Sequence, residues 1–184
     1  MKTRLISPVL LDELTARAEA SPRRRMNENF HPDDDFPAHR LLNAIEPDSY
    51  VRPHRHLDPR KGETILCLRG RLGCILFDEA GGVQSTYVLE PGGTCGIDIA
   101  HGQYHSLVAL LPGSVMFEAK AGPYQPLTPD ELASWAPASG SQADAFLLGM
   151  ITLFDEGMAL STHRCSRTTG SGNCSGSVLP TRKC

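Results

Sequence analysis

The sequence predicts a mainly β protein, an antiparallel barrel or sandwich with a helix before it and helices after it. Between residues 40 and 124, apolar runs of four to eight residues alternate with short breaks rich in Gly, Pro and Asp. Leucines recur at helical spacing in the first twenty residues, and helix-start signals return after residue 125. These three observations fix the expected order of elements.

The N-terminal helix is expected over Pro8 to Ala20. Leu10, Leu11, Leu14 and Ala18 lie on one side of it, with charged residues between them. From Arg23 to Arg40 the composition turns polar and rich in Pro and Asp, which predicts an irregular arm.

The central strands are expected at seven apolar runs: LLNAI, TILCL, LGCILF, STYVL, GIDI, HSLVALL and SVMFEAK. The segment Asp78 to Gly82 (DEAGG) separates two of them and predicts a hairpin loop. Residues 40–124 therefore form the expected barrel, behind a helix and arm at residues 1–39.

Two helices are expected over residues 125–157. Thr128-Pro129-Asp130-Glu131 has the pattern of a capping box, which predicts a helix to about Trp135, and Ser141 to Phe154 has a second apolar side. Residues 158–184 are dominated by Ser, Thr, Gly and basic residues, so we expect a flexible tail.

The bulk composition excludes several classes of protein. A chain of 184 residues fits one domain, and its formal net charge of -3 argues against nucleic acid as a partner. The N-terminus is not a signal peptide, and the longest apolar run, Ala145 to Phe154, is too short to cross a bilayer. We therefore expect a soluble, cytoplasmic protein without a membrane partner, whose six cysteines are thiols.

The segment PHRHLDPRKGE contains candidate metal ligands. If Tyr50 to Leu57 is a strand, His54 and His56 point to one face of it, and Glu63 starts the next strand. His105 stands at the start of another strand and could supply a fourth ligand. Three imidazoles and a carboxylate suit one divalent ion, Fe, Mn, Ni or Zn. Taken singly, the histidines also fit surface or core positions, and Glu63 fits an ion pair with Arg60 or Arg69.

The order of these motifs resembles the two conserved motifs of the cupins. The first is present as His54-x-His56, Glu63 and Gly70, and the second as Pro91-Gly92-Gly93 leading to His105. More narrowly, four phrases look like the WbuC-family cupin fold metalloproteins: RRRMNENFH, RLLNAIEPDSYVRPHRH, KGETILCLRGRLG and HSLVALLPGSVMFEAKAGPY. The resemblance implies a cupin-type jelly-roll barrel that holds a metal through His54, His56, Glu63 and His105. Cupins frequently dimerise, so it also implies a homodimer.

The resemblance favours a metal-dependent enzyme that acts on a small carbohydrate-type substrate in surface-polysaccharide metabolism. Two other functions stay open: a non-catalytic, metal-stabilised sugar-binding or regulatory module, and an Fe(II) dioxygenase. Whether the protein is an enzyme at all is thus left open at this stage.

Candidate catalytic and binding residues lie close to the metal motifs in the sequence. Glu118, Lys120 and Tyr104 are candidate acids or bases, although Glu118 and Lys120 could equally form a surface ion pair. Arg25, Asn29 and His31 of the polar arm, together with Tyr124, are candidate ligands of a sugar-like substrate. An arm with a purely structural role is the alternative. Cys67 is expected to be a buried, inert thiol.

Overall fold

The computed structural model describes residues 3–155. Helix α1 (Pro8–Ala20) begins at Ser7, whose Oγ accepts a hydrogen bond from the Leu10 amide at 3.4 Å. Proline at the first helical position needs no amide partner there, which explains the sharp start. The predicted first helix is confirmed.

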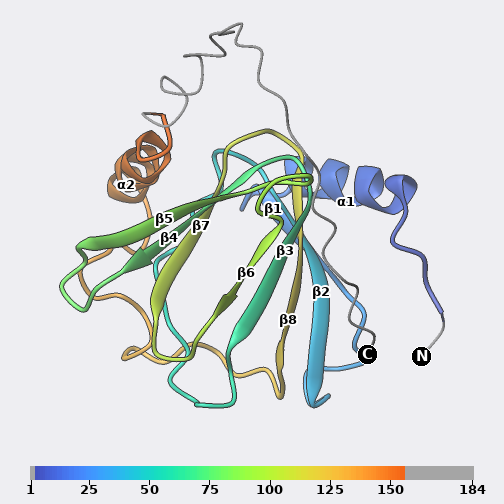
Figure 1. Cartoon of the computed structure of the whole chain (residues 1–184), viewed down its shortest axis with the longest axis horizontal. Coiled ribbons are helices and arrows are strands. Elements are labelled where there is room, and N and C mark those ends of the chain that lie inside the picture. The colour runs from blue at the N-terminus through green and yellow to red at the C-terminus, as the bar shows by residue number, and fades with distance from the viewer. Residues whose placement is uncertain (1–2, 156–184) are drawn as a thin grey trace, which may run out of the picture.

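Within the described residues, eight strands form two antiparallel sheets (Figure 1). The five-stranded sheet has the order β1 (Arg25–Asn29), β2 (Ala38–Ile45), β8 (Ser114–Ala121), β3 (Glu63–Arg69), β6 (Gly96–Ile99). The three-stranded sheet has the order β5 (Val83–Leu89), β4 (Leu72–Phe77), β7 (Tyr104–Ala109). Strands that are far apart in the chain are neighbours in both sheets, so the fold is a jelly-roll-like β fold, as the sequence predicts. The DEAGG segment joins β4 to β5 as the expected hairpin loop.

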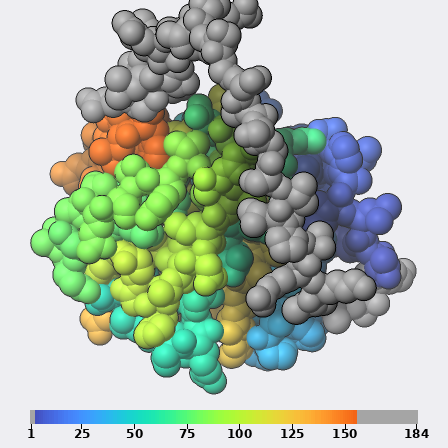
Figure 2. Space-filling view, viewed as in Figure 1, coloured from blue at the N-terminus to red at the C-terminus, as the bar shows by residue number. Residues whose placement is uncertain are grey.

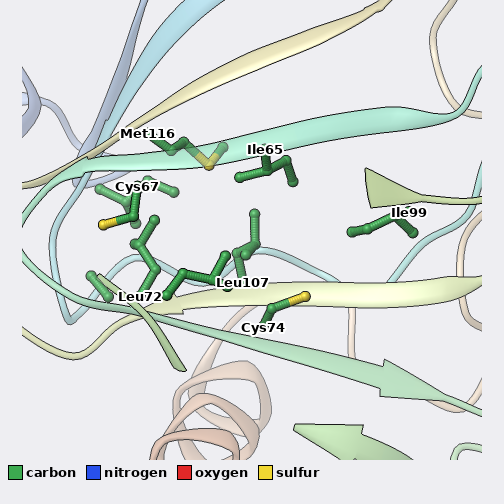
Figure 3. Packing of buried hydrophobic residues seen from close by; sticks show 10 residues of the cluster. Ile65, Cys67, Leu72, Cys74, Ile99, Leu107 and Met116 are labelled. Carbon is green, nitrogen blue, oxygen red and sulfur yellow. The ribbon is translucent and has the colours of Figure 1, made fainter. Parts of the chain in front are cut away.

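The main core lies between the two sheets. Figure 3 shows Ile65 and Met116 of the larger sheet facing Leu107 and Cys74 of the smaller one. Cys67 is buried in the same cluster, and burial raises the pKa of its thiol; burial also raises the pKa of Cys74 to about 12. Both thiols are protonated at neutral pH, as expected for Cys67.

Within residues 3–155, one helix packs on the outer side of each sheet. Figure 2 shows the blue N-terminal helix and the orange C-terminal helix on different sides of the molecule. Leu11, Leu14 and Ala18 of α1 pack against Leu42 and Val115 of the larger sheet. Helix α2 (Ser141–Thr152) covers the smaller sheet. No helix within residues 3–155 combines the length and the apolar character that a membrane crossing requires.

Three local expectations were wrong. The segment expected as an irregular arm contains β1, which pairs along its whole length with β2. Residues 50–57 contain no named strand, and His54 makes only isolated bridges, to His105 and to Leu132. The capping-box segment forms no helix. Thr128 does donate its amide to Glu131 Oε2 at 2.9 Å, as a capping box requires.

The backbone of the capping-box segment bonds to residues 53–55 instead of continuing as a helix. The Ala133 amide donates to the Pro53 carbonyl at 3.0 Å, and the Arg55 amide donates to the Glu131 carbonyl at 2.9 Å. The expected second helix is present as α2. The tail expected at residues 158–184 lies outside the described residues.

A substitution at Gly70 tests the turn between β3 and β4. Gly70 has φ +74°, and a Cβ there would come within 2.8 Å of the Ser114 backbone. We expect Gly70→Ala to lower the free energy of unfolding by about 2–3 kcal/mol, because backbone strain and a clash add together. Gly92→Ala is the matched control, with φ +85° and no atom near the added Cβ; it should cost only about 1 kcal/mol. Urea unfolding of both variants measures the difference, and equal losses would contradict the clash.

Candidate metal centre and cavity

The candidate metal centre is built on a backbone pairing between two distant segments. The His54 amide donates to the His105 carbonyl at 3.0 Å, and the His105 amide donates back to the His54 carbonyl at 2.9 Å. This pairing sets the two imidazole rings side by side, with centroids 4.6 Å apart. The ring of His56, two residues further along the same segment, has its centroid 5.5 Å from that of His54.

Backbone carbonyls fix the tautomers of two of these histidines. Nδ1 of His54 lies 3.0 Å from the Arg52 carbonyl, and Nδ1 of His105 lies 3.0 Å from the Gln103 carbonyl. A carbonyl only accepts, so Nδ1 of each ring carries the proton and donates it. For His54 this leaves Nε2 as a lone-pair donor, which is the form in which imidazole binds a metal ion.

Glu63 is the common partner of the other two rings. Its Oε1 lies 2.8 Å from His56 Nε2, and its Oε2 lies 3.1 Å from His105 Nε2. Burial alone would raise the pKa of Glu63, but hydrogen bonds from His105 and His56 and the charge of Lys120 lower it well below its usual range. The carboxyl group is therefore ionised and available to a cation.

Burial acts in the opposite direction on His54. It lowers the pKa of His54 to about 3, with the neighbouring His105 adding to the effect. His54 is thus neutral at physiological pH, as a metal ligand must be.

The residues fit a divalent ion. The candidate ligand atoms of His54, His56 and Glu63 all lie within 4.8 Å of one another. His105 is outside that compact set, but its Nε2 touches Glu63. The structure therefore brings the four predicted ligands together, three of them closely and His105 at the margin. Nitrogen and oxygen donors of this kind suit Zn, Fe, Mn or Ni.

Lys120 links Glu63 to Glu118. Its Nζ lies 2.8 Å from Glu63 Oε1 and 2.7 Å from Glu118 Oε1. Burial works to lower the pKa of Lys120, yet the two carboxylates outweigh it and raise that pKa above its usual value. Glu118 is buried, so the two residues form an interior ion pair and not the surface pair considered above.

A cavity of about 460 Å³ opens beside these residues. Alternating positions of the larger sheet face it, because side chains alternate along a strand. The register places His39, Lys120 and Glu63 in one row across β2, β8 and β3, at the metal end. Arg25 pairs with Ile45 at the opposite end of β2.

The structure brings most of the predicted binding residues to this cavity. Arg25, Asn29, His31 and Tyr124 all line it, as do Glu118 and Lys120. Tyr104 does not. It precedes His105 on β7 and points to the other face, where it packs against Trp135 and lies under the guanidinium of Arg55 at 4.2 Å.

Sequence reasoning missed other lining residues, among them Asn27, His39 and Asn43. His39 stacks on His31, with ring centroids 4.0 Å apart. The signal for His39 and Asn43 was present in AHRLLNAI, where both residues share the inward face with Leu41 and Ile45. A polar residue on the inward face of a strand needs a partner, which marks a cavity wall.

Comparisons with known proteins give a match to a family model over part of the chain and a similarity in fold. Residues 6–89 match the family described as a domain of unknown function, DUF6016. No curated protein matches the sequence.

Three solved structures illustrate the similarity in fold. KdgF from Halomonas sp. is 18% identical with a TM-score of 0.44, over 57% of this chain and 84% of that chain. The polyketide cyclase RemF from Streptomyces resistomycificus is 21% identical with a TM-score of 0.48, over 70% and 82%. The SPY1581 protein of unknown function from Streptococcus pyogenes is 12% identical with a TM-score of 0.46, over 68% and 92%. Because all three TM-scores are below 0.5, these similarities say nothing about what this chain binds.

Proposed function

We propose that this protein is a metal-binding cupin that holds one divalent ion through His54, His56, Glu63 and His105. One observation carries the proposal: the candidate ligand atoms of His54, His56 and Glu63 lie within 4.8 Å of one another, and the Glu63 carboxylate is buried and ionised. Imidazole and carboxylate groups gathered in this way can exchange their protons for a metal ion. The narrower likeness to the WbuC family belongs to the same proposal and rests on the sequence phrases quoted above.

The adjoining cavity supports an activity on a small hydroxylated, carbohydrate-type molecule. Its wall carries amide, imidazole and carboxylate groups that can hydrogen-bond to hydroxyls. A role in surface-polysaccharide metabolism is part of this proposal and has only the sequence resemblance behind it.

Within such a reaction the chain's own residues have distinct parts. A divalent ion would act as a Lewis acid on a carbonyl or diol oxygen. Lys120 stays protonated, so it orients Glu63 and Glu118 and does not accept a proton. Glu118 is the acid or base of the set, because its carboxylate lines the cavity without contacting a candidate ligand residue in any bond described above.

Metal analysis tests the proposal. Protein purified without chelators or a histidine tag is expected to contain about one Zn, Fe, Mn or Ni per chain, and His56→Ala is expected to lose it. Elemental analysis by mass spectrometry reads out both. A wild-type protein that holds no metal and takes none up on reconstitution would overturn the proposal.

A non-catalytic binding module is the second candidate. Four protein residues can fill all positions of a tetrahedral ion, whereas catalytic ions keep one position open. Glu118→Gln distinguishes an enzyme from a binding module. In an enzyme the substitution should lower turnover by about 100-fold or more while the metal is retained. Ligand binding without any turnover in the wild type would favour the module.

A further inference from the structure

Arg25 is a cation without a counter-ion at the far end of the cavity. Its Nη1 donates to Ser49 Oγ at 3.2 Å and to the Tyr50 carbonyl at 2.8 Å, and both acceptors are neutral. Within residues 3–155 no carboxylate pairs with it. Burial, and then the charge of Arg23, lower the pKa of Arg25, which shows that its surroundings do not compensate the charge.

The acidic groups of the cavity are engaged elsewhere. Glu63 and Glu118 share Lys120 at the metal end. Asp34 lies near that end too, because its carbonyl contacts His39 Nε2 at 3.1 Å. A half-buried guanidinium facing a cavity under these conditions favours an anionic occupant, and its planar donors match a carboxylate.

Amide side chains line the wall between Arg25 and the metal end. Asn27, Asn29 and Asn43 face the cavity from β1 and β2. Oδ1 of Asn43 is buried and accepts no hydrogen bond. An orphaned buried acceptor is costly, so a hydroxyl donor from a bound molecule or water is expected there.

The distance between the two ends suits a small molecule. The guanidinium of Arg25 is held on the carbonyl of Tyr50, four residues before His54, so the backbone between these residues spans at most about 14 Å. The cavity volume of about 460 Å³ lies within the range of small-ligand sites.

We propose that the cavity binds a small hydroxylated carboxylate, with its carboxylate on Arg25 and its hydroxyls on the amide wall. The opposite end of the ligand would meet the metal centre, and only that part rests on the proposed function. The contact with Arg25 does not require the metal.

Binding of D-glucuronate and D-glucuronamide tests this proposal, because the two probes share their hydroxyls and differ in one charge. By titration calorimetry, glucuronate is expected to bind about 10- to 100-fold more tightly, both in the metal-loaded and in the chelator-treated protein. Equal affinities for the two probes, or no glucuronate binding at millimolar concentration, would overturn the proposal.

Two variants locate the effect. Arg25→Gln is expected to abolish the preference for glucuronate, whereas Arg23→Gln removes an exposed charge two residues away and should preserve it. Because Arg25 also anchors residues 49 and 50, Arg25→Lys serves as a milder variant that keeps the charge and part of the preference. If neither Arg25 variant folds, the ratio of the wild-type affinities for glucuronate and glucuronamide still tests whether the cavity prefers a carboxylate.

Failure of this proposal can be told apart from failure of the proposed function. A preference that disappears on metal removal and survives in Arg25→Gln would mean that the metal holds the carboxylate, which overturns the inference and keeps the metal centre. A preference for glucuronate that depends on Arg25, in a protein that never takes up metal, would support the inference and overturn the proposed metal centre.

Discussion

Replacing Lys120 by methionine is expected to lower the free energy of unfolding of the metal-free protein by about 3–5 kcal/mol. The substitution removes the only cation within bonding distance of both Glu63 and Glu118 among the described ion pairs, and it leaves two buried carboxylates facing each other. The size of the loss follows from removing one partner of a buried pair. Urea unfolding after chelator treatment measures it.

The same variant should respond more strongly to metal than the wild type does. A divalent ion supplies the positive charge that the variant lacks, so Zn²⁺ is expected to raise the melting temperature of Lys120→Met by more than that of the wild type. Lys61→Met is the matched control. Lys61 lines a second, smaller pocket that His56 also lines, and among the described residues its side chain donates to the Pro123 carbonyl at 3.0 Å. Its loss should therefore change stability by less than about 1 kcal/mol. A Lys120→Met protein as stable as the control would show that the two carboxylates do not need this cation.

Replacing His105 by glutamine is expected to weaken metal binding by about 100-fold or more. The residue supplies Nε2 next to Glu63, and its Nδ1 is held by a carbonyl in the orientation of a ligand. Loss of an outer-shell partner costs about 10–100-fold, and loss of a direct ligand should exceed that. Competition titration with a chromogenic chelator gives the two affinities.

His101→Gln is the control for this measurement. His101 is exposed and lies on the loop before β7, so its replacement removes an imidazole that is close in sequence but outside the centre. It should leave the affinity unchanged. If His105→Gln also kept the wild-type affinity, the ion would be held by His54, His56 and Glu63 without it.

Elements governed by local alternation were predictable from the sequence. LGCILF and STYVL are apolar enough to be strands. DEAGG between them consists largely of residues that favour a turn, and it forms the hairpin loop. The grouping of His54, His56 and Glu63 was predictable for the same reason, because two residues separated by one share a face of an extended segment. The same alternation puts Tyr104 on the opposite face of β7 from His105, away from the cavity.

Elements governed by distant pairing were not predictable. RMNEN has one apolar residue, and its strand conformation depends on the ladder that β2 provides. The segment after Thr128 has the local bond of a helix start, but two of its backbone groups, the Glu131 carbonyl and the Ala133 amide, bond to residues 53–55. Partners of this kind cannot be read from a local pattern, and they override a capping signal of modest strength.

The long separation of Glu63 and His105 in the chain also has a kinetic consequence. Glu63 and His105 are 42 residues apart in the chain, and they meet only after both sheets have assembled around them. Closing so long a loop comes late in the folding of a β protein, so the unfolded chain offers an ion little more than the adjacent His54 and His56. A bound ion would then act on the unfolding rate, and its release would report the moment at which the two sheets separate.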